Sequence, residues 1–112
     1  MIGVSLAAAL SAPKLKPFQF SKDIALGKKE KLYCTVLEGE GPFTFTWSKD
    51  GTAVENSALF RIQSIDEETS TLQIQAVRAE HVGNYTCSVR GALGSDSVTT
   101  ALLLNGLTAR GQ

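Results

Sequence analysis

The feature that most constrains this chain is a set of four residues, Cys34, Trp47, Tyr85 and Cys87, set within short stretches of alternating polarity. The cysteines lie 53 positions apart, the only Trp follows the first by 13, and a Tyr precedes the second by two. This spacing is typical of a sandwich in which the cysteines face each other across two sheets, the indole packs on their disulfide and the phenol bonds back to the backbone. We therefore predict a Cys34–Cys87 disulfide, with Trp47 and Tyr85 in the core.

Length, charge and cysteine count narrow the class of protein. The 112 residues suffice for one domain, since a sandwich of this kind takes about 100. Eleven basic and eleven acidic side chains cancel, so no charge excess indicates nucleic acid or an anionic membrane as a partner. The predicted bridge uses both cysteines and persists in an oxidising compartment, which indicates an extracellular protein, secreted or held at the cell surface.

The two ends of the chain differ from the predicted domain, which we place at residues 13–104. Residues 1–12 form an uncharged apolar run that ends in small side chains, and they resemble the apolar part of a secretory signal. The run lacks a positive start, so a leader remnant and an added tail both remain open. Residues 105–112 lose the alternation and are interpreted as a linker or a tag. We expect any membrane attachment to come from a C-terminal anchor beyond this sequence.

Alternation of apolar and polar residues predicts an all-β fold of short strands. The expected strands, lettered in chain order, are A (18–20), B (30–37), C (43–48), C′ (52–54), D (60–65), E (around 72–74), F (around 85–89) and G (97–104). Cys34 has to point inward, which places Leu32 and Val36 in the core. The same alternation turns Leu72 inward from strand E, and the pair Asp50-Gly51 predicts a tight turn after strand C.

Five motifs are spread along this region: Phe-Gln-Phe at 18–20, Thr-Phe-Thr-Trp-Ser-Lys-Asp-Gly at 44–51, Ser-Ile-Asp at 64–66, Ser-Thr-Leu at 70–72 and His-Val-Gly-Asn-Tyr-Thr-Cys at 81–87. Together they resemble the intermediate-set immunoglobulin domains of Dscam-type receptors, the relatives of the Down syndrome cell adhesion molecule. The resemblance implies an immunoglobulin-like sandwich of two antiparallel sheets, in the strand orders A-B-E-D and A′-G-F-C-C′. The motifs around Trp47 and Cys87 also occur in titin-like domains, so the combination carries the resemblance.

The resemblance also implies a function. An apolar leader joined directly to the domain is similar to the first domain of the shortened Dscam-like receptors of chelicerates, which mediates isoform-specific homophilic recognition between cells. The chain would then belong to the ectodomain of a single-pass membrane receptor. It would pair antiparallel with a copy of itself on an opposing cell, without a cofactor.

Enzymatic and metal-binding roles find no support in the residues. One His, no free Cys under the disulfide prediction and no pairing of a nucleophile with a base leave catalysis without candidates. The acidic run at residues 66–68 lies on a predicted turn, whereas a calcium site needs oxygen ligands that converge from several positions. We therefore predict neither catalysis nor a metal site.

One position departs from the family pattern. These domains usually carry an Asp six residues before the second Cys, paired with an Arg at the start of strand D. His81 occupies the first position here, and Arg61 stands at the second. The ion pair is therefore missing unless the neighbouring Glu80 substitutes. A lone His at a domain edge belongs to no cluster of reactive groups, so we expect a structural role for it.

Asn84 begins the sequon Asn-Tyr-Thr, and alternation from Tyr85 and Cys87 turns it outward, so we predict an N-glycan there. A glycan would obstruct the lower half of the G-F-C face, whose other outward residues are Thr44, Thr46, Ser48, Ser88, Arg90, Ala101 and Leu103. Ser and Thr rarely dominate binding energy, whereas Tyr and Arg are enriched in interface cores. We therefore predict a homophilic interface on the A-B-E-D face, formed by Tyr33, Leu37, Arg61, Gln63, Gln73 and Gln75.

Two other functions remain open. A titin-like structural spacer would share the fold, and two free thiols without a glycan would favour it. A receptor domain that binds a different protein would use the loops at 38–42 and 91–94 more than a sheet face.

Overall fold

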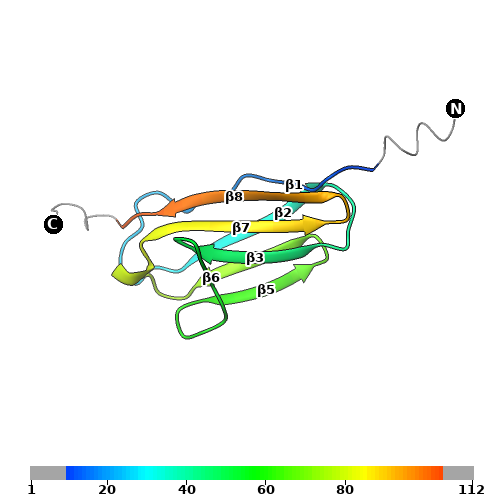
Figure 1. Ribbon diagram of the computed structural model, residues 1–112. Helices are drawn as coiled ribbons and strands as arrows, with labels where there is room; N and C mark the ends of the chain where they lie inside the picture. The colour runs from blue at the N-terminus through cyan, green and yellow to red at the C-terminus, as the bar shows by residue number, and fades with distance from the viewer. Residues whose placement is uncertain (1–9, 105–112) are drawn as a thin grey trace, which may run out of the picture.

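Two four-stranded antiparallel sheets pack face to face in the computed structural model, which describes residues 10–104 (Figure 1). The first sheet has the order β1-β2-β6-β5, with β1 (Lys14–Leu15), β2 (Glu30–Glu38), β6 (Thr69–Ile74) and β5 (Arg61–Asp66). The second has the order β4-β3-β7-β8, with β4 (Thr52–Ala53), β3 (Thr44–Lys49), β7 (Gly83–Gly91) and β8 (Gly94–Leu102). These are the predicted A-B-E-D and G-F-C-C′ orders, so the sandwich fold is confirmed. The predictions for residues 1–9 and 105–112 lie outside the described range.

The predicted first strand at residues 18–20 is wrong. The edge strand β1 lies earlier, at Lys14–Leu15, and pairs with the end of β2. The last bond of this pairing runs from the Lys16 N–H to the Thr35 carbonyl at 2.9 Å. Pro17 follows, and its ring fixes φ at about −65°, away from the value of about −140° that an antiparallel strand adopts.

Phe18 and Phe20 serve the core without forming a strand. The Phe18 ring lies 5.7 Å from the Trp47 ring, and the Phe20 ring meets Tyr85 edge-on at 5.2 Å. The alternation that suggested a strand therefore reflects two aromatic side chains that anchor an irregular segment between the sheets.

Other boundaries differ from the prediction by a few residues. The expected A′ strand is reduced, within residues 10–104, to an isolated parallel bridge between Ile24 and Leu104. Strand β6 already begins at Thr69, and β8 at Gly94. The turn predicted at 50–51 is present, with positive φ at both of its residues.

The predicted Cys34–Cys87 disulfide joins β2 of one sheet to β7 of the other, with 6.4 Å between the Cα atoms. Trp47 lies opposite Cys87 in the β3–β7 pair, and Ser70 lies opposite Cys34 in the β2–β6 pair. The indole Nε1–H donates a hydrogen bond to Ser70 Oγ at 3.0 Å. The indole therefore links the two sheets beside the disulfide, in a core where Leu72 is also buried.

Tyr85 forms a second anchor at the other end of the core. It is fully buried, and its hydroxyl donates a 2.6 Å hydrogen bond to the carbonyl of His81, at the end of the 3-10 helix η1 (Ala79–His81). The rings of Phe20 and Phe60 pack edge-on against it. Burial raises the pKa of the Tyr85 hydroxyl, so the phenol stays protonated and keeps donating this bond.

Candidate functional site

The outer face of the β1-β2-β6-β5 sheet carries the residues predicted to bind a partner. Cross-strand pairing places Tyr33, Thr71 and Gln63 in one row, because Thr71 lies opposite both of the others. Arg61 and Gln73 lie in the next row, opposite each other. The structure therefore brings four of the six predicted residues together as neighbours on one face.

The remaining two predicted residues lie at the margins of this face. Gln75 directly follows β6, and its Oε1 accepts a 2.7 Å hydrogen bond from Gln73 Nε2. Leu37 lies near the far end of β2, where 57% of it is exposed. Tyr33, in the middle of the strand, is 52% exposed. The face thus presents a central aromatic ring with polar neighbours and a separate apolar residue toward one end.

Three further residues belong to this face and were not among those predicted from the sequence. Lys31 lies opposite Gln73, and its Nζ lies 5.4 Å from the centroid of the Tyr33 ring, a cation–π contact. Ile65 follows from the alternation of β5 and is 54% exposed beside a bulge. Thr71 is buried although it faces outward, because its cross-strand neighbours flank it. The same alternation that identified Tyr33 would have found all three.

The opposite face of the sandwich is rich in hydroxyl groups. The Thr86 and Thr99 hydroxyls hydrogen-bond each other at 2.7 Å across β7 and β8. Asn84 is exposed at the lower part of this face, and its cross-strand neighbour is the small Ala101. Leu103 lies beyond the end of β8 and is 65% exposed. This geometry leaves room for a glycan on Asn84, which stays a prediction.

The turn beside Asn84 is held by Asp50. One carboxylate oxygen of Asp50 accepts the Asn84 N–H at 2.9 Å, and the other accepts from Lys49 Nζ at 3.1 Å. The Asn84 amide, and then Lys49, hold the pKa of Asp50 below its usual range. The β3–β4 turn is therefore tied to the start of β7 at the edge of the hydroxyl-rich face.

The possible substitution of Glu80 for the missing carboxylate partner of Arg61 is wrong. Glu80 Oε1 lies 3.4 Å from Arg78 Nε, and among residues 10–104 Arg61 takes part in no ion pair. His81 makes a different connection. Its imidazole is buried, Nδ1 accepts the Arg78 N–H at 2.9 Å, and Nε2 lies 3.2 Å from the Leu59 carbonyl.

This pattern assigns the tautomer of His81. A backbone N–H can only donate, so Nδ1 carries no proton and Nε2–H donates to Leu59. Leu59 lies two residues before Arg61, the position that pairs with Asp in the family pattern. A neutral imidazole therefore ties η1 to the segment before β5, where the family pattern would use an ion pair.

A receptor domain that binds a different protein would use the loops at 38–42 and 91–94. These two loops lie side by side at one end of the sandwich. The Ala92 N–H donates to the Glu40 carbonyl at 2.9 Å, which joins the 91–94 loop to the 38–42 loop. A cavity of about 580 Å³ opens beside them, lined by Phe43 and Phe45 and by the acidic turn at 66–68.

The part of the chain in view contains no group of three His, Cys, Asp or Glu side chains placed to hold a metal ion. None of its helices is long and apolar enough to cross a membrane.

Comparison with known proteins identifies similar domains. The model of the immunoglobulin I-set domain family matches residues 13–104. The human cell adhesion molecule DSCAM is 38% identical over 78 residues, which cover 70% of this chain and 4% of that protein. The chain therefore spans only a small part of the length of this relative.

Solved structures of other proteins also resemble this chain. The crystal structure of the Dscam1 Ig7 domain, isoform 5, has a TM-score of 0.80 and 29% identity, and the match covers 84% of this chain and 97% of that one. An I-band fragment of titin has a TM-score of 0.75 and 29% identity, with 86% of this chain and 33% of the fragment covered.

Proposed function

Because this chain belongs to the immunoglobulin I-set family, we propose that it is a recognition module of a Dscam-type cell adhesion receptor and binds a second copy of itself. The module would act at the cell surface, between cells, and its partner would be an identical isoform. The similarity to DSCAM and to the Dscam1 Ig7 domain supports an adhesion role. Self-binding and its isoform specificity are the proposed steps beyond that similarity.

The observation that carries the proposal is the outer face of the β1-β2-β6-β5 sheet. Its centre combines a half-exposed Tyr33 with Arg61 and two glutamines in adjacent cross-strand rows. Tyr and Arg are, with Trp, the residue types that most often dominate binding energy, because they bury large areas and still form hydrogen bonds. The opposite face offers mainly hydroxyl groups, and a glycan on Asn84 would cover part of it. A self-contact would be two-fold, with the same patch on both copies.

The proposal is tested by the oligomeric state of the chain and of two matched variants. Sedimentation across a wide concentration range is expected to reveal a reversible dimer. Tyr33→Ala weakens this dimer because it removes the central aromatic contact, whereas Leu103→Ala, on the other face, leaves it unchanged. Isolated-domain affinity is expected to be low, since receptors gain avidity by arraying many copies. A monomer at every concentration would contradict self-binding.

A titin-like spacer would carry two free thiols and no glycan, so the state of the cysteines distinguishes it from a receptor module. The structure joins Cys34 to Cys87, and a receptor module outside the cell keeps this bridge. Mass spectrometry of the protein as made by its natural source should find no free thiol and a glycan on Asn84. Two free thiols and no glycan would favour the spacer.

A further inference from the structure

We infer that a groove beside β2 binds a sulfated polysaccharide through two lysines and an exposed aromatic ring. The inference goes beyond self-binding and takes from the proposed function only the location outside the cell. It starts from an uneven distribution of charge. Residues 14–31 contain six lysines and two acidic side chains, a net charge of +4, so the rest of the chain carries −4. The neutral total therefore conceals a basic segment.

The groove lies between β2 and the segment that follows β1. Its volume is about 400 Å³, and its lining includes Lys16, Phe18, Lys31, Tyr33 and Thr35. The Lys16 N–H donates to the Thr35 carbonyl at 2.9 Å, which fixes one end of the groove. Lys31, near the start of β2, lies at the other end. Within residues 10–104, no acidic side chain lines the groove.

The two lysines of the groove are free to bind an anion. Lys16 and Lys31 are exposed, and neither takes part in the ion pairs found within residues 10–104. Glu30 precedes Lys31 in the chain, but its Oε1 accepts the Ser21 N–H at 3.2 Å, outside the groove lining. Both ends of the groove therefore present an ammonium group to solvent.

The spacing of these lysines favours a polymer over a small anion. Lys16 lies beside Thr35, and Thr35 lies four residues beyond Lys31, which corresponds to about 13 Å along an extended strand. The Debye length at physiological salt is about 8 Å, so one small anion cannot interact strongly with both. Lys29, two residues before Lys31, is also exposed and continues the line of cations. A chain that carries anionic groups at intervals can meet these cations in turn.

The exposed ring of Tyr33 indicates what kind of chain the groove fits. Tyr33 lies between the two lysines, it is 52% exposed, and Lys31 Nζ lies 5.4 Å from the centroid of its ring. A sugar ring can stack its C–H groups on this aromatic face, because the face carries negative charge density. A sulfate on the same sugar then meets the neighbouring ammonium.

Other polyanions fit the groove less well. An acidic peptide offers carboxylates but no flat C–H surface for the Tyr33 ring. A nucleic acid offers both charge and stacking, but the proposed location outside the cell favours sulfated polysaccharides as the available polyanions. The Cys34–Cys87 disulfide supports that location.

The test measures binding of the full chain to a fluorescent heparin octasaccharide and to the same oligosaccharide without its sulfates. Tyr33 also belongs to the proposed self-binding face, so the protein is kept at concentrations at which sedimentation finds a monomer. The sulfated form should bind at low salt and bind more weakly as salt rises, because salt screens the lysines and opposes counterion release. The desulfated form should not bind.

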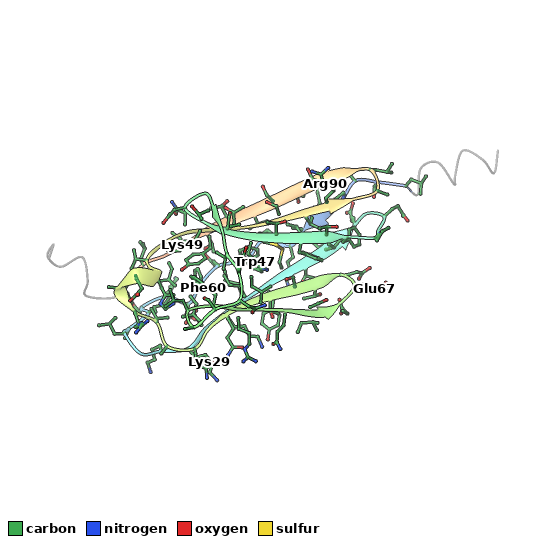
Figure 2. All side chains as sticks on the ribbon, turned by 60° about the horizontal axis from the view of Figure 1, so that its bottom comes forward. Lys29, Trp47, Lys49, Phe60, Glu67 and Arg90 are labelled. Carbon is green, nitrogen blue, oxygen red and sulfur yellow. A yellow bond between two sulfur atoms is a disulfide. The ribbon has the colours of Figure 1, made fainter. Side chains whose placement is uncertain are left out.

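Single-charge variants locate the site. Lys16→Gln and Lys31→Gln should each weaken binding about threefold, the size typical of an exposed ion pair. Because about 13 Å separates the two positions, their effects should multiply to about tenfold in the double variant. Arg90→Gln removes the same charge from β7 of the opposite sheet and should leave binding unchanged. Figure 2 shows Lys29 and Arg90 on opposite sides of the sandwich, and thermal unfolding checks that every variant is folded.

Tyr33→Leu separates stacking from charge. Leucine keeps an apolar side chain but lacks a flat ring, so affinity for the octasaccharide should fall severalfold. The dependence of affinity on salt should stay the same, because no charge is removed, whereas the two lysine variants should make it shallower. A Tyr33→Leu variant with unchanged affinity would overturn the assignment to a saccharide.

The outcomes separate this inference from the proposed self-binding. No binding at low salt, or an equal loss in Arg90→Gln and the lysine variants, overturns the site. Equal affinity for single-stranded DNA or polyglutamate overturns the saccharide as its ligand. A chain that stays monomeric at every concentration but binds the octasaccharide through Lys16 and Lys31 overturns self-binding and supports this inference. A chain that dimerises without binding the octasaccharide does the reverse.

Discussion

Replacing His81 by leucine tests whether the imidazole takes the place of the family's ion pair. Leucine fills a similar volume, so the main loss is two hydrogen bonds, to the Arg78 N–H and the Leu59 carbonyl. A buried polar group left without a partner costs about 1–3 kcal/mol. Both partners are only part-buried, so water can reach them and each loss falls in the lower half of that range. We therefore expect the free energy of unfolding to fall by about 2–4 kcal/mol.

Two milder variants each remove only one of the two His81 hydrogen bonds, so they show how much each bond contributes to the loss. The side-chain oxygen of His81→Asn reaches the position of Nδ1 and keeps the Arg78 bond, whereas the amide of His81→Gln reaches toward Leu59 and keeps the other. Each should cost about half as much as leucine. Urea unfolding measures the free energies, and the leucine variant should melt about 8–32 °C lower, since 1 kcal/mol corresponds to about 4–8 °C in a domain of this size. A leucine variant that loses less than about 0.5 kcal/mol would refute the proposed link.

Three further changes probe the anchors of the fold. Tyr85→Phe removes the 2.6 Å bond to the carbonyl at the end of η1 and should lower the free energy of unfolding by about 1–2 kcal/mol in urea titrations. A variant as stable as the natural chain would show that this hydrogen bond does not anchor η1. Ser70→Ala leaves the buried indole N–H of Trp47 without its acceptor and should cost about 1–3 kcal/mol, measured in the same way; a neutral result would mean that the indole does not need this link. The lowered pKa of Asp50 means that its carboxylate stabilises the fold above its ordinary value of 3.8 and that this stability is lost on acidification. Asp50→Asn should therefore be less stable than the natural chain at pH 7, with a difference that shrinks below about pH 4; a pH-independent difference would contradict this.

Much of the fold could be predicted from spacing and alternation alone. Cys34 sets the inward parity of β2, and Trp47 and Tyr85 set that of the opposite sheet, so the core faces follow. The strand orders came from the resemblance to Dscam-type domains, because parity does not tell which strands are neighbours. The failure at residues 18–20 has a physical cause. Alternation indicates which side chains are buried, but not whether the backbone has a free neighbour to pair with, and Pro17 ends the ladder just before that segment.

In the candidate site, too, some features could be predicted from the sequence and others could not. Tyr33 and Arg61 could be assigned to one face by parity, and the structure places them in adjacent rows. The link from His81 to Leu59 could not be predicted, because it spans 22 residues and depends on a turn whose path no local pattern describes. The role of Ser70 could not be predicted either, because nothing in the sequence around a strand serine indicates that it accepts a hydrogen bond from an indole.

The most direct test of self-recognition through one sheet face is a dilution series followed by NMR of the backbone amides. If two copies bind through this face, signals from β2, β5 and β6 shift with concentration, while those from β3, β7 and β8 stay in place. Concentration-dependent shifts confined to β3, β7 and β8, or no shifts up to millimolar protein, would contradict self-binding through this face.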